Sequence, residues 1–402
     1  MTHAGNFANF FESLKETLLA YFFDLGGLFA GFMVASQLHV FQMSPWALAL
    51  YPAIIGAKGV IGGLLSGRLS TGLHLGTVYP RFSSNTKSFY KLIEALIVMT
   101  LVTSVAMSAI SIVFGHLFWG ITFVDFPAIL SIVMATMAIG LALFLVNVKV
   151  AFISFQRGLD PDVVVYPIMS AVASIFITFC YIVALNLFFI FDYLGKWIIV
   201  ILVLAHVLLV LYIFPKNMRE QEFIKTIKES LAALMFVALI VNVTGTLFRG
   251  ISNFAKDRKE IYTIYPALIG MISDVGSVVG STATTKLALG LLAPSFSSIR
   301  HHAKNIFSAW VASIIMFVVL AVLSPSLHGI FSLPAFSSFI SVLLVANFIA
   351  VAAIVLISYG VSILTFQKGL DPGNFVIPIE SSFAASVTSV ALLAALLLVG
   401  SL

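Results

Sequence analysis

The sequence predicts an all-α polytopic membrane protein, and three observations support this prediction. Of the 402 residues, 61% are hydrophobic and only 9% are charged, and the mean hydropathy is +1.12. So few polar side chains cannot cover the surface of a water-soluble protein of this size. Apolar stretches of about 20 residues, the length that crosses a bilayer core as a helix, recur along the chain. The chain also repeats a distinctive seven-residue segment, which indicates two related halves.

The apolar stretches predict about eleven transmembrane helices. The fourth and tenth stretches are long enough to contain a break, and prolines in the fifth and eighth allow those helices to tilt or kink. In chain order, the predicted helices span residues 17–38, 45–67, 89–114, 127–152, 163–191, 195–214, 229–248, 262–291, 305–324, 335–364 and 375–401.

The repeated segment indicates an internal duplication. Residues 155–161 read Phe-Gln-Arg-Gly-Leu-Asp-Pro, and residues 366–372 read Phe-Gln-Lys-Gly-Leu-Asp-Pro. Two further motifs recur at a separation of 214 residues, Tyr-Pro-Ala-x-Ile-Gly from Tyr51 and Tyr265 and Pro-x-Phe-Ser-Ser from Pro80 and Pro294. Predicted helices one to five therefore correspond to helices seven to eleven, and helix six is a linker.

This correspondence predicts a first five-helix repeat over 1–193, a linker helix and cytoplasmic loop over 194–225, and a second five-helix repeat over 226–402. Because five is odd, direct fusion would invert the second repeat, and the linker helix restores the parallel orientation. The repeats are then related by a pseudo-two-fold axis along the membrane normal. One helix fewer would make the repeats inverted instead.

The basic residues predict how the chain is oriented in the membrane. Lysine and arginine gather in the loops on the side of the N-terminus, including Arg68, Lys87 and Arg157, whereas the opposite loops hold few outside the cluster at 249–259. Cytoplasmic loops carry such an excess of basic residues. We therefore expect a multi-pass protein of the cell (plasma) membrane, with a cytoplasmic N-terminus and an extracellular C-terminus.

The composition and motifs argue against several other classes of protein. The formal net charge of +5 is spread over short loops without an aromatic-interleaved basic patch, so nucleic acid is not an expected partner. One cysteine, Cys180, cannot form a disulfide within the chain. The eight histidines lack the spacing of zinc or copper ligands. Because the chain has no phosphate-binding loop, zinc-protease motif or Gly-x-Ser-x-Gly turn, we expect neither an enzyme nor a cofactor.

Several motifs resemble a known family of transporters. Gly56-Ala57-Lys58-Gly59, followed by Ser-Gly-Arg-Leu-Ser-Thr at 66–71, resembles the signature of the solute carrier family 41 magnesium transporters and their archaeal relatives. These proteins share the membrane domain of bacterial MgtE. The Leu-Asp-Pro segments at 159–161 and 370–372, each with a proline seven residues after the aspartate, resemble the fifth helix of that domain.

The resemblance implies a transporter or channel for a divalent metal cation, with Mg²⁺ as the transported ion. In MgtE the two five-helix units belong to separate subunits, and here they would be fused. The ion path is then expected between the two pseudo-symmetric halves, so that a monomer in the lipid bilayer acts as a fused pseudo-dimer. The divalent cation is the expected substrate, and no cofactor is implied.

The sequence departs from the family at the central ion site. The family's fifth helix carries an aspartate fourteen residues after the aspartate of Asp-Pro, and those positions are Ser174 and Ala385 here. The acidic position that follows Lys-Gly is Val60 in the first repeat, and its counterpart in the second repeat is Asp274. A transporter of another substrate, having lost the central carboxylate pair, is therefore an alternative, as is a membrane scaffold without transport.

Acidic residues within the predicted helices are the candidate ligands, because an unpaired charge at membrane depth costs a few kcal/mol or more. Asp274 lies among small residues, Glu380 follows a proline by two residues and has Met169 as its counterpart, and Asp24 precedes two glycines. For each, a polar contact between helices is the alternative interpretation. With neighbouring hydroxyl and amide groups, the predicted metal ligands are Asp274, Glu380, Ser273, Ser277, Asn374 and Asp24.

Three further charged residues have simpler interpretations. Asp160 and Asp371 each precede a proline at a predicted helix start, so we expect them to cap helices. Lys58 would repel a cation, and we hypothesise that it pairs with Asp274 and so closes or tunes the path. Extension of Lys58 towards the membrane surface is the alternative. Mg²⁺ suits such a sparse site because it keeps much of its water and binds one or two carboxylates.

Overall fold

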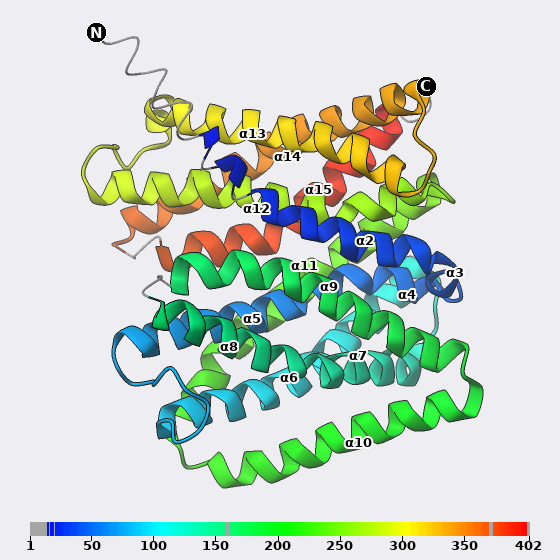
Figure 1. Cartoon of the computed structure of the whole chain (residues 1–402), viewed down its shortest axis with the longest axis vertical. Coiled ribbons are helices and arrows are strands. Elements are labelled where there is room, and N and C mark those ends of the chain that lie inside the picture. The colour runs from blue at the N-terminus through cyan, green and yellow to red at the C-terminus, as the bar shows by residue number, and fades with distance from the viewer. Residues whose placement is uncertain (1–13, 16, 20, 158–160, 370–372, 400–402) are drawn as a thin grey trace. The chain divides into compact units, whose positions relative to one another are not determined.

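The structure, a computed structural model, describes residues 14, 15, 17–19, 21–157, 161–369 and 373–399. Within helices, it leaves undescribed the side chains of residues 58–60, 63, 64, 67, 71, 161–170, 222, 225, 229, 230, 232, 233, 335 and 373–378. The described residues form helices joined by short loops, with no strand among them (Figure 1).

The helices follow the predicted order along the chain, with short helical turns at several ends. The elements are η1 (Phe23–Leu25), α2 (Gly26–Ser36), α3 (Leu38–Phe41), α4 (Pro45–Ala49), α5 (Tyr51–His74), α6 (Lys87–Phe114), η2 (Gly115–Trp119), η3 (Phe123–Asp125), α7 (Phe126–Gly140), α8 (Ala142–Gln156), α9 (Pro161–Phe189), α10 (Asp192–Asn217), α11 (Gln221–Ala255), α12 (Lys259–Ala288), η4 (Phe296–Ser298), α13 (Ile299–Leu327), α14 (Leu333–Gln367) and α15 (Gly373–Val399).

The structure confirms an all-α polytopic membrane protein. Ten helical stretches within the described residues are long and apolar enough to cross a membrane. The remaining predicted span, residues 45–67, falls on α4 and α5. The predicted span 127–152 is interrupted at Leu141 between α7 and α8, whereas 335–364 lies within the continuous helix α14.

The helices form two compact units that do not coincide with the sequence repeats. Unit 1 consists of Met1–Ser36 and Gly250–Leu402, and unit 2 consists of Gln37–Arg249. The first helix of the first repeat, α2, thus belongs to unit 1 with the second repeat. Most of α11, the first helix of the second repeat, belongs to unit 2 with the first repeat. The two repeats have exchanged their first helices.

Glycines hold each exchanged helix close to its unit. In unit 1, a Cβ added at Gly31 of α2 would collide with the carbonyl oxygen of Thr263 in α12. In unit 2, a Cβ added at Gly245 of α11 would collide with the carbonyl oxygen of Ala49. The two glycines are 214 residues apart in the sequence, and so are the two residues that they contact. The same contact is therefore made once in each unit. Small residues at such contacts let helix backbones approach closely.

Two hydrogen bonds also occur in both units and explain parts of the repeated motifs. The Tyr51 hydroxyl lies 3.0 Å from Thr178 Oγ1, and the Tyr265 hydroxyl lies 2.7 Å from Ser389 Oγ, which joins the second helix of each repeat to its fifth. The glutamines of the repeated segment each donate to the first proline of the Pro-x-Phe-Ser-Ser loop at 2.7 Å, Gln156 to Pro80 and Gln367 to Pro294.

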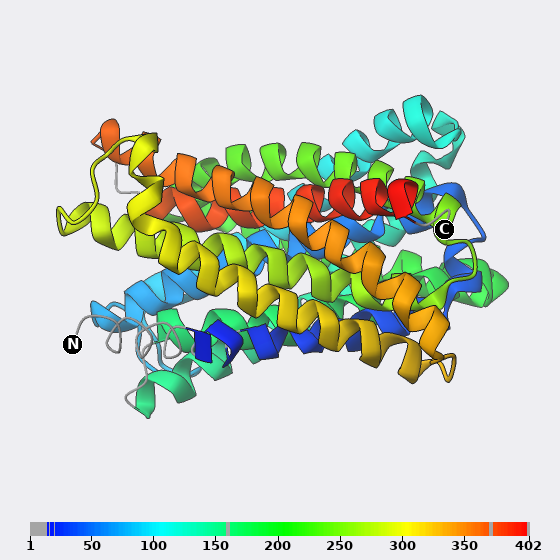
Figure 2. The ribbon, with the colours of Figure 1, turned by 90° about the horizontal axis from the view of Figure 1, so that it is seen from above.

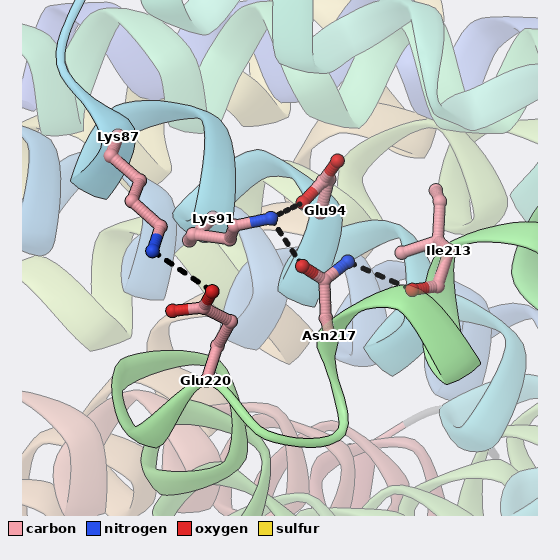
Figure 3. A network of polar contacts seen from close by, with 6 residues as sticks. All are labelled: Lys87, Lys91, Glu94, Ile213, Asn217 and Glu220. Carbon is pink, nitrogen blue, oxygen red and sulfur yellow. Dashed lines mark hydrogen bonds and ion pairs between the residues drawn. The ribbon is translucent and has the colours of Figure 1, made fainter.

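A polar network in unit 2 fixes the end of the linker helix α10 against the start of α6 (Figure 3). Lys91 donates to Glu94 at 2.9 Å and also to Asn217, whose amide donates to the Ile213 carbonyl at 2.8 Å. Lys87 pairs with Glu220 at 2.9 Å, and this ammonium lowers the pKa of Glu220 below its usual value. The Lys87–Glu220 pair is therefore present at neutral pH and is lost as the pH falls through that lowered pKa.

The exchanged-helix contacts predict opposite effects of alanine at three glycines. Gly31→Ala and Gly245→Ala should each destabilise the protein by about 1–3 kcal/mol, because the added methyl group overlaps a backbone carbonyl. Gly62→Ala is the control, since no atom of the described residues lies within 4 Å of its Cβ position. This substitution should stabilise α5 by about 0.5–1 kcal/mol. Thermal unfolding in detergent measures all three, and equal midpoints for Gly31→Ala and Gly62→Ala would contradict the packing described.

Candidate cation-binding site

Helix α12 is the central element of unit 1. It packs against α2, α13, α14 and α15, and the α14 and α15 helices lie side by side, in orange and red in Figure 2. The half of α12 before Gly270 is almost entirely buried, whereas Ser273, Asp274 and Ser277 are half-buried. The polar residues of α12 therefore lie in the middle of a membrane-spanning helix, where each must meet a partner, water or an ion.

Glu380 of α15 is held against α12 by two contacts. Its carboxylate oxygen Oε1 accepts a hydrogen bond from Ser273 Oγ at 3.1 Å. Its other oxygen, Oε2, lies against Gly276, where a Cβ would collide with it. The side chain is only 1% exposed, and Oε2 has no hydrogen-bond partner among the described residues. The absence of a side chain at Gly276 thus makes room for a buried carboxylate.

Asp24 reaches α12 from η1, the turn that precedes the exchanged helix α2. Its oxygen Oδ1 lies against Gly270, where a Cβ would collide with it. Its carboxyl group interacts with the Asp274 carboxyl group through charge and a side-chain hydrogen bond. The oxygen Oδ2 of Asp24 is buried and has no hydrogen-bond partner in the described part of the chain. Two carboxyl groups in contact cannot both stay ionised unless a cation lies near them.

The third carboxylate belongs to the same electrostatic cluster. Asp274 interacts with Glu380 as well as with Asp24, and the buried ring of Tyr21 carries a hydroxyl that interacts with all three. None of the three carboxylates forms an ion pair with a lysine or arginine that the structure describes. We call Asp24, Asp274 and Glu380 the acidic cluster.

A polar stripe leads from the acidic cluster to the end of α12. Asp274, Ser277, Ser281 and Thr285 are three or four residues apart and so lie on one face of the helix. Ser277 is half-buried, whereas Ser281 and Thr285 are exposed. Thr285 donates its hydroxyl to the Ser281 carbonyl at 3.1 Å, which leaves the hydroxyl oxygen able to accept from water.

Four of the predicted ligands lie together in unit 1: Asp24, Ser273, Asp274 and Glu380. Ser277 lies one turn along α12. Asn374 is in the first turn of α15, but its side chain, like that of Lys58, falls outside the described residues, so the Lys58–Asp274 pair stays a hypothesis. Asp160 and Asp371 also lie outside the described residues. Among the residues that are described, no three His, Cys, Asp or Glu side chains form a group placed to hold a metal ion.

The acidic cluster has no acidic counterpart in unit 2. The positions equivalent to Asp274 and Glu380 are Val60 and Met169. The exchanged glycine contacts align α2 with α11 at a separation of 214 residues, and this alignment pairs Asp24 with Ala238. Sequence reasoning missed the roles of Gly270 and Gly276. Gly270 precedes Asp274 by four residues and Gly276 follows it by two. Glycines this close to an acidic residue in a membrane-spanning helix were the signal that other side chains approach α12 here.

Comparison with known proteins identifies a family for most of the chain. A family model described as MgtE, divalent cation transporter, matches twice, over residues 51–184 and 265–396. The two matches confirm the predicted tandem duplication. The second match contains Asp274 and Glu380, whereas Asp24 lies outside both. A search of curated proteins and a search of solved structures found no match.

The contact between Asp24 and Asp274 predicts how Asp24→Asn will behave. Without divalent cations the variant should be at least as stable as the wild type, because a neutral amide at position 24 removes the repulsion that ionisation of both carboxyl groups would cause. Mg²⁺ at about 100 times its dissociation constant should stabilise the wild type by about 2.7 kcal/mol and the variant by clearly less. Thermal unfolding with and without Mg²⁺ measures both effects. The exposed Asp192→Asn is the control, and an undiminished Mg²⁺ effect in Asp24→Asn would count against a cation at this pair.

Proposed function

Because the chain belongs to the MgtE family of divalent cation transporters, we propose that it moves a divalent cation, Mg²⁺ in preference, across the plasma membrane and binds it at the Asp24–Asp274 pair of the acidic cluster. The observation that carries this assignment is the contact between the Asp24 and Asp274 carboxyl groups. Glu380 interacts with Asp274 through its charge. A divalent cation balances this concentration of negative charge inside a membrane protein.

The chemistry of the ligands favours a hard cation. Carboxylate and hydroxyl oxygens are the ligands of Mg²⁺, which keeps several water molecules and typically binds to one or two carboxylates. The interacting pair Asp24 and Asp274, with the Ser273 hydroxyl next in sequence, offers two carboxylates, and a partly hydrated ion needs no more. The polar stripe on α12 offers hydroxyl groups to a hydrated ion that approaches or leaves.

The remaining parts of the proposal come from the duplication and the family. We propose that one chain acts as a fused pseudo-dimer, with its N-terminus in the cytoplasm and its C-terminus outside. The ion path between the two halves, which the family resemblance implies, stays a prediction, and so does a role for Lys58 in closing or tuning it. The family is one of transporters, and we propose neither a catalytic activity nor a cofactor.

A transporter of another substrate on the same scaffold is the second candidate. It is favoured by Ser174 and Ala385, which occupy the positions where the family resemblance implies paired carboxylates. In this second case the acidic cluster would serve helix packing alone, and substitution within it would change stability without changing cation flux.

Flux into proteoliposomes tests the proposal directly. Reconstituted wild-type protein should pass Mg²⁺, measured with an entrapped fluorescent indicator. Asp274→Asn and Glu380→Gln should each weaken Mg²⁺ binding about tenfold or more, because each removes a charge-assisted interaction worth about 1.5–3 kcal/mol. Asp192→Asn should leave the flux unchanged. Wild-type protein that is folded and correctly reconstituted but passes no divalent cation would refute the proposal.

A further inference from the structure

A second group of unpaired oxygen atoms lies beside the acidic cluster. Ser358 of α14 is fully buried, and its Oγ has no hydrogen-bond partner among the described residues. A Cβ added at Gly276 would lie 2.8 Å from Ser358 Oγ and from Ile354 Cγ1 and would collide with Glu380 Oε2. Two buried oxygens without partners thus converge on the same face of Gly276. We call Glu380 Oε2, Ser358 Oγ and the face of Gly276 the niche.

The equivalent place in unit 2 has a different character. There a cavity of about 30 Å³, lined largely by apolar atoms, is bordered by Gly62, Asn147 and Ile177. Asn147 is satisfied, since its amide donates to Ser66 Oγ at 3.1 Å and its Oδ1 accepts from the same hydroxyl. A void of this size has room for about one water molecule, yet its apolar walls offer water little to bind.

The duplication relates these three lining residues to unit 1. Gly62 corresponds to Gly276, Asn147 to Ser358 and Ile177 to Thr388. Thr388 is 3% exposed, and its Oγ1 is also without a partner among the described residues. An amide bonded to Ser66 and an apolar side chain in one repeat are therefore replaced in the other by two hydroxyls without partners among the described residues, and Met169 is replaced by Glu380.

The chemistry of the niche indicates a cation. A buried oxygen without a partner is costly, and an unpaired carboxylate is the most costly case. Ser358 and Glu380 both offer oxygen lone pairs, which are the ligands of a small, hard cation. We infer that unit 1 binds a second hard cation at Glu380 Oε2 and Ser358 Oγ, in addition to the one proposed for the Asp24–Asp274 pair.

Two sources of such a cation are compatible with this chemistry. The first is a second ion of the divalent substrate, and the other is a monovalent alkali cation. In both cases Glu380 stands between the sites, because its Oε1 accepts from Ser273 beside Asp274 while its Oε2 lies in the niche. The inference rests on the proposed function only in taking the Asp24–Asp274 pair as the first site.

Counting bound ions on the purified full-length protein tests the inference. Equilibrium dialysis against Mg²⁺, with and without Na⁺ or K⁺, should give two cations per wild-type chain. A second Mg²⁺ identifies the substrate as the occupant, and an alkali cation that binds alongside one Mg²⁺ identifies a monovalent occupant. Ser358→Ala should lose the second ion and keep the first, whereas Asp24→Asn should lose the first. One Mg²⁺ per wild-type chain, with no alkali cation bound, would overturn the inference.

A control and an isosteric variant guard against misfolding. Ser104→Ala, in unit 2, removes an equally buried hydroxyl that bonds to its own helix, at 2.7 Å from the Thr100 carbonyl, and should change neither count. Ser358→Cys nearly keeps the size of the side chain but offers a soft sulfur, so the second ion should bind more weakly than to the wild type. Cd²⁺, a soft cation, should bind the variant at least about tenfold more tightly than it binds the wild type. A Ser358→Cys protein that elutes like the wild type and shows unchanged Mg²⁺ and Cd²⁺ binding would also overturn the inference. These results do not depend on flux, so the failure of transport and the failure of the second site can be told apart.

Discussion

The close approach of neighbouring elements to the glycines of α12 is the constraint on which unit 1 depends. Gly270 makes room for the Asp24 carboxylate, and Gly276 makes room for that of Glu380. Gly31 lets α2 pack against the backbone of α12 at Thr263, about two turns before Gly270. In a bilayer the hydrophobic effect does not drive helices together, so packing and interhelical hydrogen bonds must do so. The same small residues that permit the packing therefore also bring three carboxylates into one cluster.

After the exchange of their first helices, the two units share the same packing contacts between helices but differ in their buried polar residues. Both units keep the glycine-to-carbonyl contact, the tyrosine-to-hydroxyl bond and the glutamine-to-proline bond. They differ where unit 1 carries Asp24, Asp274 and Glu380. In a homodimer, any substitution changes both halves at once. A fused chain can keep the contacts that hold each unit together and change the polar residues of one unit alone, and this explains how the acidic cluster comes to be one-sided.

Composition and repetition were sufficient to predict the fold class, the duplication and most helix positions. A helix that crosses a membrane must be about 20 residues long and apolar, and both properties are visible in each segment of the sequence by itself. The contacts of Asp274 and Glu380 with polar partners were predictable for the same reason, since a charge in such a helix requires a partner, whereas their role as metal ligands stays a prediction. The contact between Asp24 and Asp274 was not predictable, because it follows from the exchange of α2, a tertiary arrangement without a local signal. Ser358 was missed because a single serine in an apolar run resembles the many that bond to their own helix, as Ser104 does.

The proposed second site gives Glu380 a double role that follows from the geometry of one carboxylate. One oxygen is already hydrogen-bonded by Ser273, next to Asp274, and the other faces Ser358 across Gly276. A cation bound to one oxygen offsets part of the carboxylate's negative charge, so the other oxygen attracts a second cation less strongly. Two cations sharing Glu380 therefore weaken each other's binding. Such coupling is reciprocal, because each ion must change the affinity for the other by the same factor. An ion that enters one site therefore helps to release the ion in the other, and a transporter needs such release as much as it needs binding.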